Sequence, residues 1–230
     1  MKKLVFTLAA VTAMAFTSCG DKNADKATTT TEQEVAVEQG DKYALNLEES
    51  VITWKVGHKG GLNPRFGTLK LESGDIAIDD SGLNAGNYIV SMNTIAVDPT
   101  SVDSEEDLGK LEGHLKSADF FGVETYPTVK FVITGVEDFN PATGASVVEG
   151  ANKRFSGNLT ILDKTVNISF PAKVEVLENK ATMEAKFVAN RTDWGLKFGT
   201  TDKEGVALNP AEWGISQDME IGVSLVADKK

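Results

Sequence analysis

The sequence predicts an all-β protein, a single antiparallel up-and-down barrel of the lipocalin type with about eight strands and one or two short helices at its mouth. Three observations indicate this fold. Apolar and polar residues alternate in many runs, turn signals separate these runs at the spacing of an antiparallel meander, and only one stretch has clear helical spacing. About eight strands with one apolar face each can close into a barrel that holds one small ligand.

The alternating runs fill most of the chain after residue 50. The clearest is residues 166–176, where every second side chain is apolar. Because successive side chains of a strand point to opposite faces, such a run has one apolar and one polar face. A sandwich with a filled core has the same pattern as a hollow barrel, so alternation alone does not predict a cavity. Similar runs occupy residues 50–57, 88–93, 129–133, 153–161, 183–189 and 219–225, and turn signals occur at residues 79–82, 140–141 and 163–164.

One segment has helical spacing. Leu108, Leu111 and Leu115 lie three and four positions apart, and Ser104 precedes them, followed directly by acidic residues. This order is typical of a helix N-terminus, where a serine side chain caps free N–H groups and acidic side chains face the positive end of the helix dipole. A lone helix that leads into a further strand predicts a plug or lid on the barrel. The long segment 195–214 has little periodicity and is expected to cover the same mouth.

The N-terminus has the pattern of an export signal. Lys2–Lys3 precede an apolar run over residues 4–16, which is too short to cross a bilayer as a helix, and the run ends near Cys19. Cys19 is the only cysteine of the chain, and its position resembles a bacterial lipoprotein cleavage site. We therefore predict a signal peptide over residues 1–18 and lipidation of Cys19, with plain secretion and a spare thiol as the alternative.

This leader sets the predicted location and domain organisation. The protein is expected to be an exported lipoprotein, anchored to a membrane of the bacterial envelope through Cys19 and facing the periplasm or the cell surface. Residues 19–41 are polar with almost nothing apolar to bury, so they are predicted to form a flexible tether. Residues 42–230 then suit one barrel domain of ordinary size.

A resemblance to a known family rests mainly on residues 114–131. His114-Leu115, Ser117, Asp119-Phe120-Phe121, Tyr126-Pro127 and Phe131 stand at the spacing of the YceI-like family of bacterial polyisoprenoid-binding proteins. Weaker matches in the same order extend the resemblance from Asp41 to the C-terminus. They are Trp54, His58-Lys59-Gly60 and Phe66-Gly67, then Gly157, Leu159-Thr160-Ile161 and Thr165, then Arg191 and Asp193-Trp194-Gly195. The chain departs from the family pattern at Gly122, Asp163–Lys164 and Val166–Asn167, which are mostly turn positions.

The resemblance implies a hollow barrel that binds, and carries or stores, a long apolar polyisoprenoid-type lipid. Each buried methylene contributes about 0.8 kcal/mol, so such a tail binds mainly through area. The aromatic pair Phe120–Phe121 would then lie near one mouth. The implied lipid-binding residues are Trp54, His58, Phe66, Met92, His114, Phe120, Phe121, Tyr126, Phe131, Phe155, Phe170, Phe187, Arg191 and Trp194.

Charge bears on the head group of that lipid. The chain carries a net charge of −11, and cleavage before Cys19 would make it more acidic by removing two lysines. Such a charge repels an anionic head group at a distance, so an isoprenoid quinone is at least as plausible as a polyprenyl phosphate. An acidic chain without a basic patch also argues against nucleic acid.

Two alternatives to lipid binding stay open. A barrel with a filled interior would be a non-catalytic scaffold or interaction lipoprotein. An enzyme acting on such a lipid would use His58, His114 or Asp193 as acid or base, but Arg191 and Asp193 are more simply a structural pair at a strand end. The sequence contains no hydrolase, P-loop, zincin or dinucleotide-binding fingerprint. No cofactor or metal is expected, because two histidines and a lipidated cysteine do not complete a zinc site, and the protein is predicted to be a monomer or homodimer.

Overall fold

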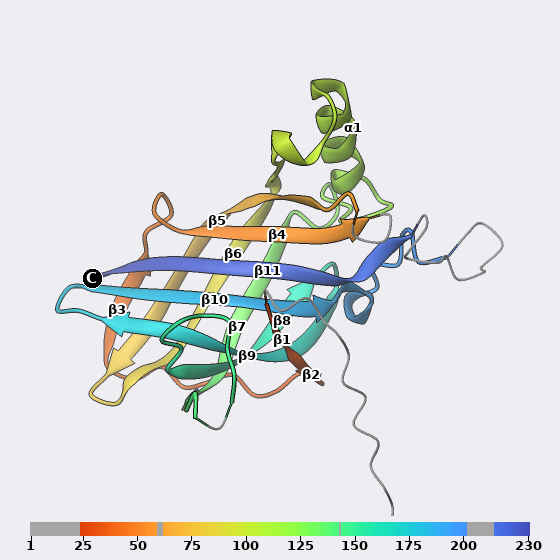
Figure 1. The fold of residues 1–230 in the computed structure, drawn as a ribbon. Helices are drawn as coiled ribbons and strands as arrows, with labels where there is room; N and C mark the ends of the chain where they lie inside the picture. Colours follow the sequence, from red (N-terminus) through yellow and green to blue (C-terminus); the bar gives the residue numbers. More distant parts are fainter. Residues whose placement is uncertain (1–23, 59–61, 143, 202–213) are drawn as a thin grey trace, which may run out of the picture.

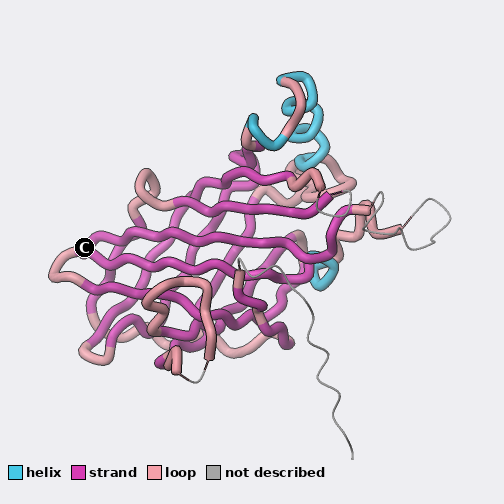
Figure 2. Tube along the Cα trace, viewed as in Figure 1, coloured by secondary structure: helices cyan, strands magenta, loops and turns pink. Residues whose placement is uncertain are grey.

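Strands dominate the computed structural model, which describes residues 24–58, 62–142, 144–201 and 214–230 (Figure 2). The predicted signal peptide and Cys19 lie outside these residues, so cleavage and lipidation stay predictions. Among the described ranges, no helix is both long and apolar enough to span a membrane. The described residues nevertheless include the whole barrel and most of its loops.

The barrel is closed by eight antiparallel strands (Figure 1). Each strand pairs with the next along the chain, and the last returns to pair with the first. This arrangement confirms the predicted up-and-down barrel. The strands are β4 (Val51–His58), β5 (Arg65–Asp79), β6 (Gly82–Val97), β7 (Thr128–Asp138), β8 (Lys153–Ile161), β9 (Lys164–Val176), β10 (Lys180–Asn190) and β11 (Ile215–Lys229).

The interior follows from the alternation in the sequence. In β9, the apolar side chains of Val166, Ile168 and Phe170 point inward and are buried. The same period places Phe155 of β8 and Phe187 of β10 in the interior, where aromatic rings meet from neighbouring strands. The predicted apolar faces are therefore the core-facing side of the barrel.

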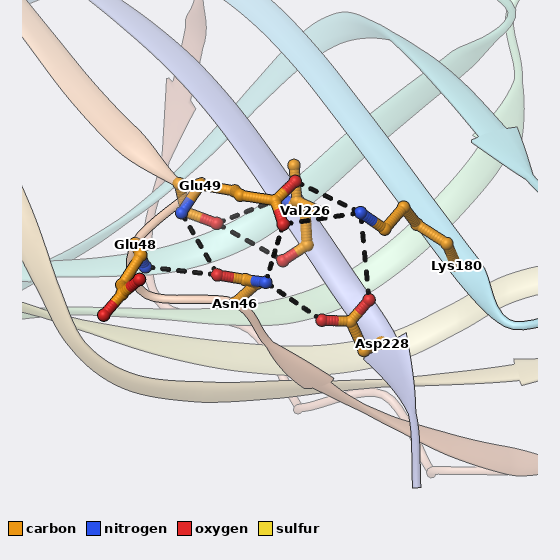
Figure 3. A network of polar contacts seen from close by, with 7 residues as sticks. Asn46, Glu48, Glu49, Lys180, Val226 and Asp228 are labelled. Atoms are coloured by element: carbon orange, nitrogen blue, oxygen red, sulfur yellow. Dashed lines mark hydrogen bonds and ion pairs between the residues drawn. The ribbon is translucent and has the colours of Figure 1, made fainter.

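A short additional strand completes the wall beside β4. β3 (Asp41–Leu45) pairs with β5 and β11, as β4 does, so β3 and β4 act as one strand that is interrupted by a turn. Figure 3 shows the polar network that holds this turn: the Asn46 side chain accepts from Glu49 N at 3.1 Å and donates to Asp228 Oδ2 at 3.1 Å. The main-chain N–H of Val226 donates to Ser50 Oγ at 3.0 Å, so the Ser50 side chain takes the place of a main-chain acceptor.

The one α-helix among the described residues begins as predicted. α1 (Glu105–Lys116) has Ser104 as its N-cap, whose hydroxyl accepts from Asp107 N at 3.1 Å. α1 stands at one end of the barrel, outside the layer of strands (Figure 1). Two short 3-10 helices, η1 (Pro99–Ser101) and η2 (Arg191–Trp194), lie in the connections at the same end.

The N-terminal segment is built into the barrel wall. β9 and β10 pair only as far as Ala172 and Ala185, next to Pro171, which has no N–H to donate. Beyond that point, β1 (Asp25–Lys26) pairs with β10 and β2 (Thr28–Thr30) pairs with β9. We call residues 25–30 the N-terminal wedge, because they fill the gap between the two strands.

After the wedge, the chain crosses the outside of the barrel. Gln33 N donates to Asn158 Oδ1 at 3.0 Å, and Asn158 Nδ2 donates to Gln33 O at 2.7 Å. Ala36 N donates to Ile133 O at 3.0 Å, further along the same path. The prediction of a flexible tether over residues 19–41 is therefore wrong from Asp25 onward. Main-chain pairing needs no apolar side chains, so composition did not reveal it.

Replacing Asn158 by alanine is expected to destabilise the protein by about 2 kcal/mol, because buried polar groups lose their partners. Asn158 is buried, and its amide also accepts from Asn167 Nδ2 at 2.9 Å. Thermal or urea unfolding measures the change. Asn84→Ala is the matched control, since Asn84 makes the same paired contact with the main chain of Gln39 where solvent can replace it. Equal losses in the two variants would contradict the expectation.

Candidate ligand-binding cavity

A cavity of about 510 Å³ opens at the end of the barrel that carries α1. We call it the mouth cavity. Its size lies within the range of small-molecule sites. Its wall combines side chains from the strand ends, from α1 and from the connections around them. The lining residues are Trp54, Val56, His58, Arg65, Leu69, Ile95, Val102, Asp103, Asp107, Lys110, Leu111, His114, Leu115, Phe120, Phe121, Arg191, Leu196, Phe198 and Ile215.

The segment after α1 places two aromatic side chains over the cavity. Phe121 N donates to Leu115 O at 3.1 Å, which turns the chain back beneath the helix. Gly122 follows with a φ of 50°, a left-handed conformation that glycine adopts without the usual cost. The departure from the family pattern at Gly122 is thus compatible with the turn. Phe120 and Phe121 both line the mouth cavity, as the resemblance implied.

Aromatic rings gather at the rim. The His114 ring meets Phe198 edge-on at 4.6 Å between centroids and Phe120 edge-on at 5.2 Å. Phe120 and Phe198 are 5.1 Å apart. We call these three residues the mouth aromatic cluster. His114 Nε2 also lies 3.5 Å from Asp119 Oδ2, so the imidazole is held between two rings and a carboxylate.

Arg191 anchors the connection that carries Phe198 at the mouth. Its side chain is 2% exposed, and its guanidinium donates to four main-chain carbonyls, those of Leu196, Phe198, Ile215 and Ser216, at 2.5–3.1 Å. Within the described residues, these contacts take the place of the predicted pair with Asp193. Burial lowers the pKa of Arg191, although a guanidinium stays charged at neutral pH. Arg191 thus orients the cavity wall rather than offering free donors to a ligand.

The first hairpin contributes a different residue from the one expected. Along β5, Gly67 and Leu69 are buried on the inner face, so Phe66 lies on the outer face and Arg65 on the inner one. Phe66 is absent from the lining of the mouth cavity, whereas Arg65 belongs to it and donates to the carbonyl of Ser101. Phe66 therefore lies outside the cavity wall in which it was expected, and Arg65, which was not predicted, lies in that wall. The alternation of β5 could have shown that Arg65, and not Phe66, is on the inner face.

Trp54 carries an unused hydrogen-bond donor. Its side chain is 7% exposed and lines the mouth cavity, and its buried indole Nε1 has no hydrogen-bond partner within the part of the chain that the structure describes. Buried polar groups normally find partners, because leaving one unpaired costs about 1–3 kcal/mol. Nε1 is accessible neither to solvent nor from the cavity, so a ligand oxygen would reach this donor only after a shift of the Trp54 side chain.

Two smaller cavities lie deeper in the barrel. A middle cavity of about 70 Å³ is lined by residues that include Met92, Phe131 and Phe187. An inner cavity of about 20 Å³ lies beyond it and includes Tyr88 and Phe131. Burial raises the pKa of the Tyr88 hydroxyl well above its usual range, which fits a dry interior. The predicted residues Met92, Phe131 and Phe187 thus face enclosed space.

The remaining predicted residues lie outside these three cavities. Phe155 and Phe170 are fully buried and pack against one another with ring centroids 6.3 Å apart. Trp194 is buried under η2, and its Nε1 donates to Leu159 O at 2.8 Å. Tyr126 is half-buried in the turn before β7. Phe198 lines the mouth but lies in a connection without periodicity, so no pattern indicated it beyond the expected cover by segment 195–214. Residues 202–213 of that segment lie outside the described ranges.

Charges of both signs surround the mouth cavity. Asp103 and Asp107 from the start of α1 lie on the same lining as Lys110, Arg65 and Arg191. Arg191 and Arg65 already donate to main-chain carbonyls. The site therefore has an apolar body with a polar rim on which positive and negative groups offset each other.

Together, the closed barrel and its hollow end define a small antiparallel β-barrel protein with an apolar ligand-type cavity. The chain belongs to the YceI-like domain family, whose model matches residues 43–227. This confirms the resemblance noted in the sequence. Protein YceI of Salmonella arizonae is 26% identical over 181 residues, which cover 77% of this chain and 78% of that protein.

Solved structures share the fold. BcnA of Burkholderia cenocepacia superposes with a TM-score of 0.57 at 14% identity, covering 79% of this chain and 98% of BcnA. A polyisoprenoid-binding domain from Saccharophagus degradans superposes with a TM-score of 0.54 at 13% identity, covering 82% of this chain and 98% of that domain. At these identities, the likeness concerns the fold alone.

Proposed function

We propose that this protein binds one isoprenoid-type lipid, with the polar head at the mouth cavity and the tail directed into the barrel. The observation that carries the proposal is the cavity of about 510 Å³, which is lined largely by apolar side chains and adjoins the middle cavity at Leu69 and Phe121. The name of the structural neighbour from Saccharophagus degradans, a polyisoprenoid-binding domain, supports the same ligand class. Binding would be driven by apolar area, at about 0.8 kcal/mol per buried methylene.

A neutral head group fits the mouth better than a phosphate. Arg191 and Arg65 donate to main-chain carbonyls, and Asp103 and Asp107 bring negative charge to the same lining. A phosphate needs donors in excess of acceptors, and the site offers few that are not already engaged. The Trp54 Nε1 donor, in contrast, would suit a single carbonyl oxygen, such as that of a quinone, once the Trp54 side chain shifts toward the cavity.

Native mass spectrometry followed by organic extraction tests the proposal on the full-length protein purified from a bacterial envelope. We expect a bound mass of isoprenoid type, recovered with its tail and head unchanged after prolonged incubation, because the proposal is binding without catalysis. Recovery of a converted lipid would favour the enzyme hypothesis. Protein that stays empty after incubation with vesicles containing ubiquinone or polyprenyl phosphate would favour the scaffold hypothesis instead.

Replacing Trp54 by phenylalanine is expected to weaken ubiquinone binding about two- to tenfold more than squalene binding. The substitution removes the Nε1 donor, and a hydrogen bond of this kind contributes about 0.5–1.5 kcal/mol. Squalene has no oxygen, so it reports only the loss of ring area, and the difference between the two ligands isolates the hydrogen bond. Titration by calorimetry measures both. An equal loss for the two lipids would show that Trp54 contributes packing alone.

We also propose that the protein is a lipoprotein, held at a membrane of the envelope by lipidated Cys19. The N-terminal wedge begins at Asp25, so an anchor at Cys19 would keep the barrel within about 20 Å of the membrane surface by chain length alone. This proximity suits a protein that exchanges lipid with a bilayer. Fractionation of cells with Cys19→Ser tests it: the variant should leave the membrane fraction, and its retention there would contradict the anchor.

A further inference from the structure

The hollow interior of the barrel is divided by two constrictions. The mouth and middle cavities share two lining residues, Leu69 and Phe121. The middle and inner cavities share Tyr88 and Phe131. The three spaces therefore follow one another from the mouth inward, and a linear tail that enters at the mouth meets Phe121 first and the Tyr88–Phe131 pair second.

The first constriction depends on a side chain that lies outside the barrel strands. Phe121 belongs to the turn between α1 and β7, where its main chain is fixed by the bond to Leu115 O. Its ring is only partly buried, and its nearest ring is Phe120 at 6.4 Å. Rotation about the side-chain bonds of Phe121 moves the ring without disturbing any strand pairing.

The second constriction is held rigidly. Tyr88 and Phe131 are register partners on β6 and β7, and their rings stack with centroids 5.0 Å apart and planes at 24°. Behind Phe131 lies Gly157, where an added Cβ would overlap the ring. Phe170 lies on another side, at 6.0 Å between centroids. Phe131 is 1% exposed, so Tyr88, Gly157 and Phe170 confine its ring on the sides that do not border the two cavities.

We propose that these constrictions determine which tail lengths the barrel accepts, with Phe121 as a gate and the Tyr88–Phe131 pair as a floor. This inference rests on the proposed function. The polar groups at the mouth hold the head group there, so the tail extends inward from a fixed point. Isoprene units that fit between the mouth and the floor are enclosed, and further units stay outside, where they contribute no additional burial.

Ubiquinones with tails of two, four, six and eight isoprene units test the inference. With the unaltered protein, affinity should rise at least about tenfold for each added pair of units until the tail reaches the floor, then stay constant. Phe131→Leu should move this plateau to a longer tail. Tyr88→Leu removes the other ring of the floor, on the paired strand β6, and should also move the plateau to a longer tail. This second variant provides the test if Phe131→Leu fails to fold.

The gate has a kinetic readout. Phe121→Ala should raise the association rate constant of the longest ubiquinone about tenfold, because entry no longer depends on rotation of the Phe121 ring out of the path. The association rate constant of the shortest ubiquinone should stay unchanged. Stopped-flow quenching of tryptophan fluorescence measures these rates. Phe66→Ala is the matched control, since Phe66 lies on the outer face of β5.

The possible results are distinct. A shifted plateau with the floor variants and a faster entry with the gate variant support the inference. If the unaltered protein binds ubiquinones but all variants keep its plateau and its rates, the inference is overturned while the proposed function stands. If no ubiquinone of any length binds to the unaltered protein, the proposed function itself fails and the inference with it.

Discussion

Replacing Arg191 by methionine is expected to destabilise the protein by about 3–5 kcal/mol, the cost of leaving several buried carbonyls without donors. The guanidinium joins the connection after η2 to the start of β11, through carbonyls of Leu196, Phe198, Ile215 and Ser216. Methionine fills a similar volume but donates nothing. Urea unfolding measures the loss, and because Leu196, Phe198 and Ile215 line the mouth, lipid affinity should fall as well.

Lysine at position 191 should recover less than half of this stability. Its ammonium presents a point charge with three donors and lacks the planar fork that reaches carbonyls on two chain segments. Arg154→Lys provides the matched control: Arg154 lies 5.1 Å from the centre of the Phe139 ring, and its replacement should cost less than about 1 kcal/mol. A fully stable Arg191→Lys variant would show that charge alone, and not the geometry of the fork, stabilises this corner.

Replacing Phe170 by alanine should cost about 3–5 kcal/mol, because a large side chain leaves the centre of the core and a cavity takes its place. Its ring is 0% exposed and stacks on Phe187 at 4.2 Å between centroids, with Phe131 at 6.0 Å and Phe155 at 6.3 Å. These residues come from four neighbouring strands, so removing the Phe170 ring weakens packing across half the barrel. Equilibrium unfolding in urea measures it.

Phe198→Ala is the control for Phe170, since both remove the same atoms. Phe198 is 41% exposed at the mouth and should cost less than about 1 kcal/mol in stability while weakening the mouth aromatic cluster. Phe170→Leu should fall between the wild-type protein and Phe170→Ala. If Phe170→Ala were as stable as Phe198→Ala, the interior would have to collapse around the missing ring, and the barrel would not be rigid at its centre.

The sequence predicted those parts of the fold in which side-chain chemistry repeats. In β9, the period of two from Val166 to Val174 indicated both the strand and its inner face, because a one-residue slip would expose every apolar side chain. α1 was equally readable from the spacing of its leucines and from Ser104. For the site, the aromatic pair Phe120–Phe121 was expected near one mouth, and both residues line the mouth cavity.

Other features have no such repeat. Phe170 and Phe131 share the same alternation, yet one lies in solid core and the other borders two cavities, because that difference depends on how rings from several strands meet. The donors of Arg191 face carbonyls from distant segments, which a pattern along the chain does not encode. The N-terminal wedge is bound through its main chain, so threonines and charged residues serve there as well as apolar ones.

The N-terminal wedge also orders the events of folding. Asp25 pairs with Phe187 and Thr28 with Ser169, so both partners lie far along the chain. Contacts of such long sequence separation form late, because the entropy of closing a long loop must be overcome first. A ribosome makes residues 25–30 early and their partner strands much later. The first strands in chain order are thus among the last to find their place, and the barrel wall is sealed only after its final strands have formed.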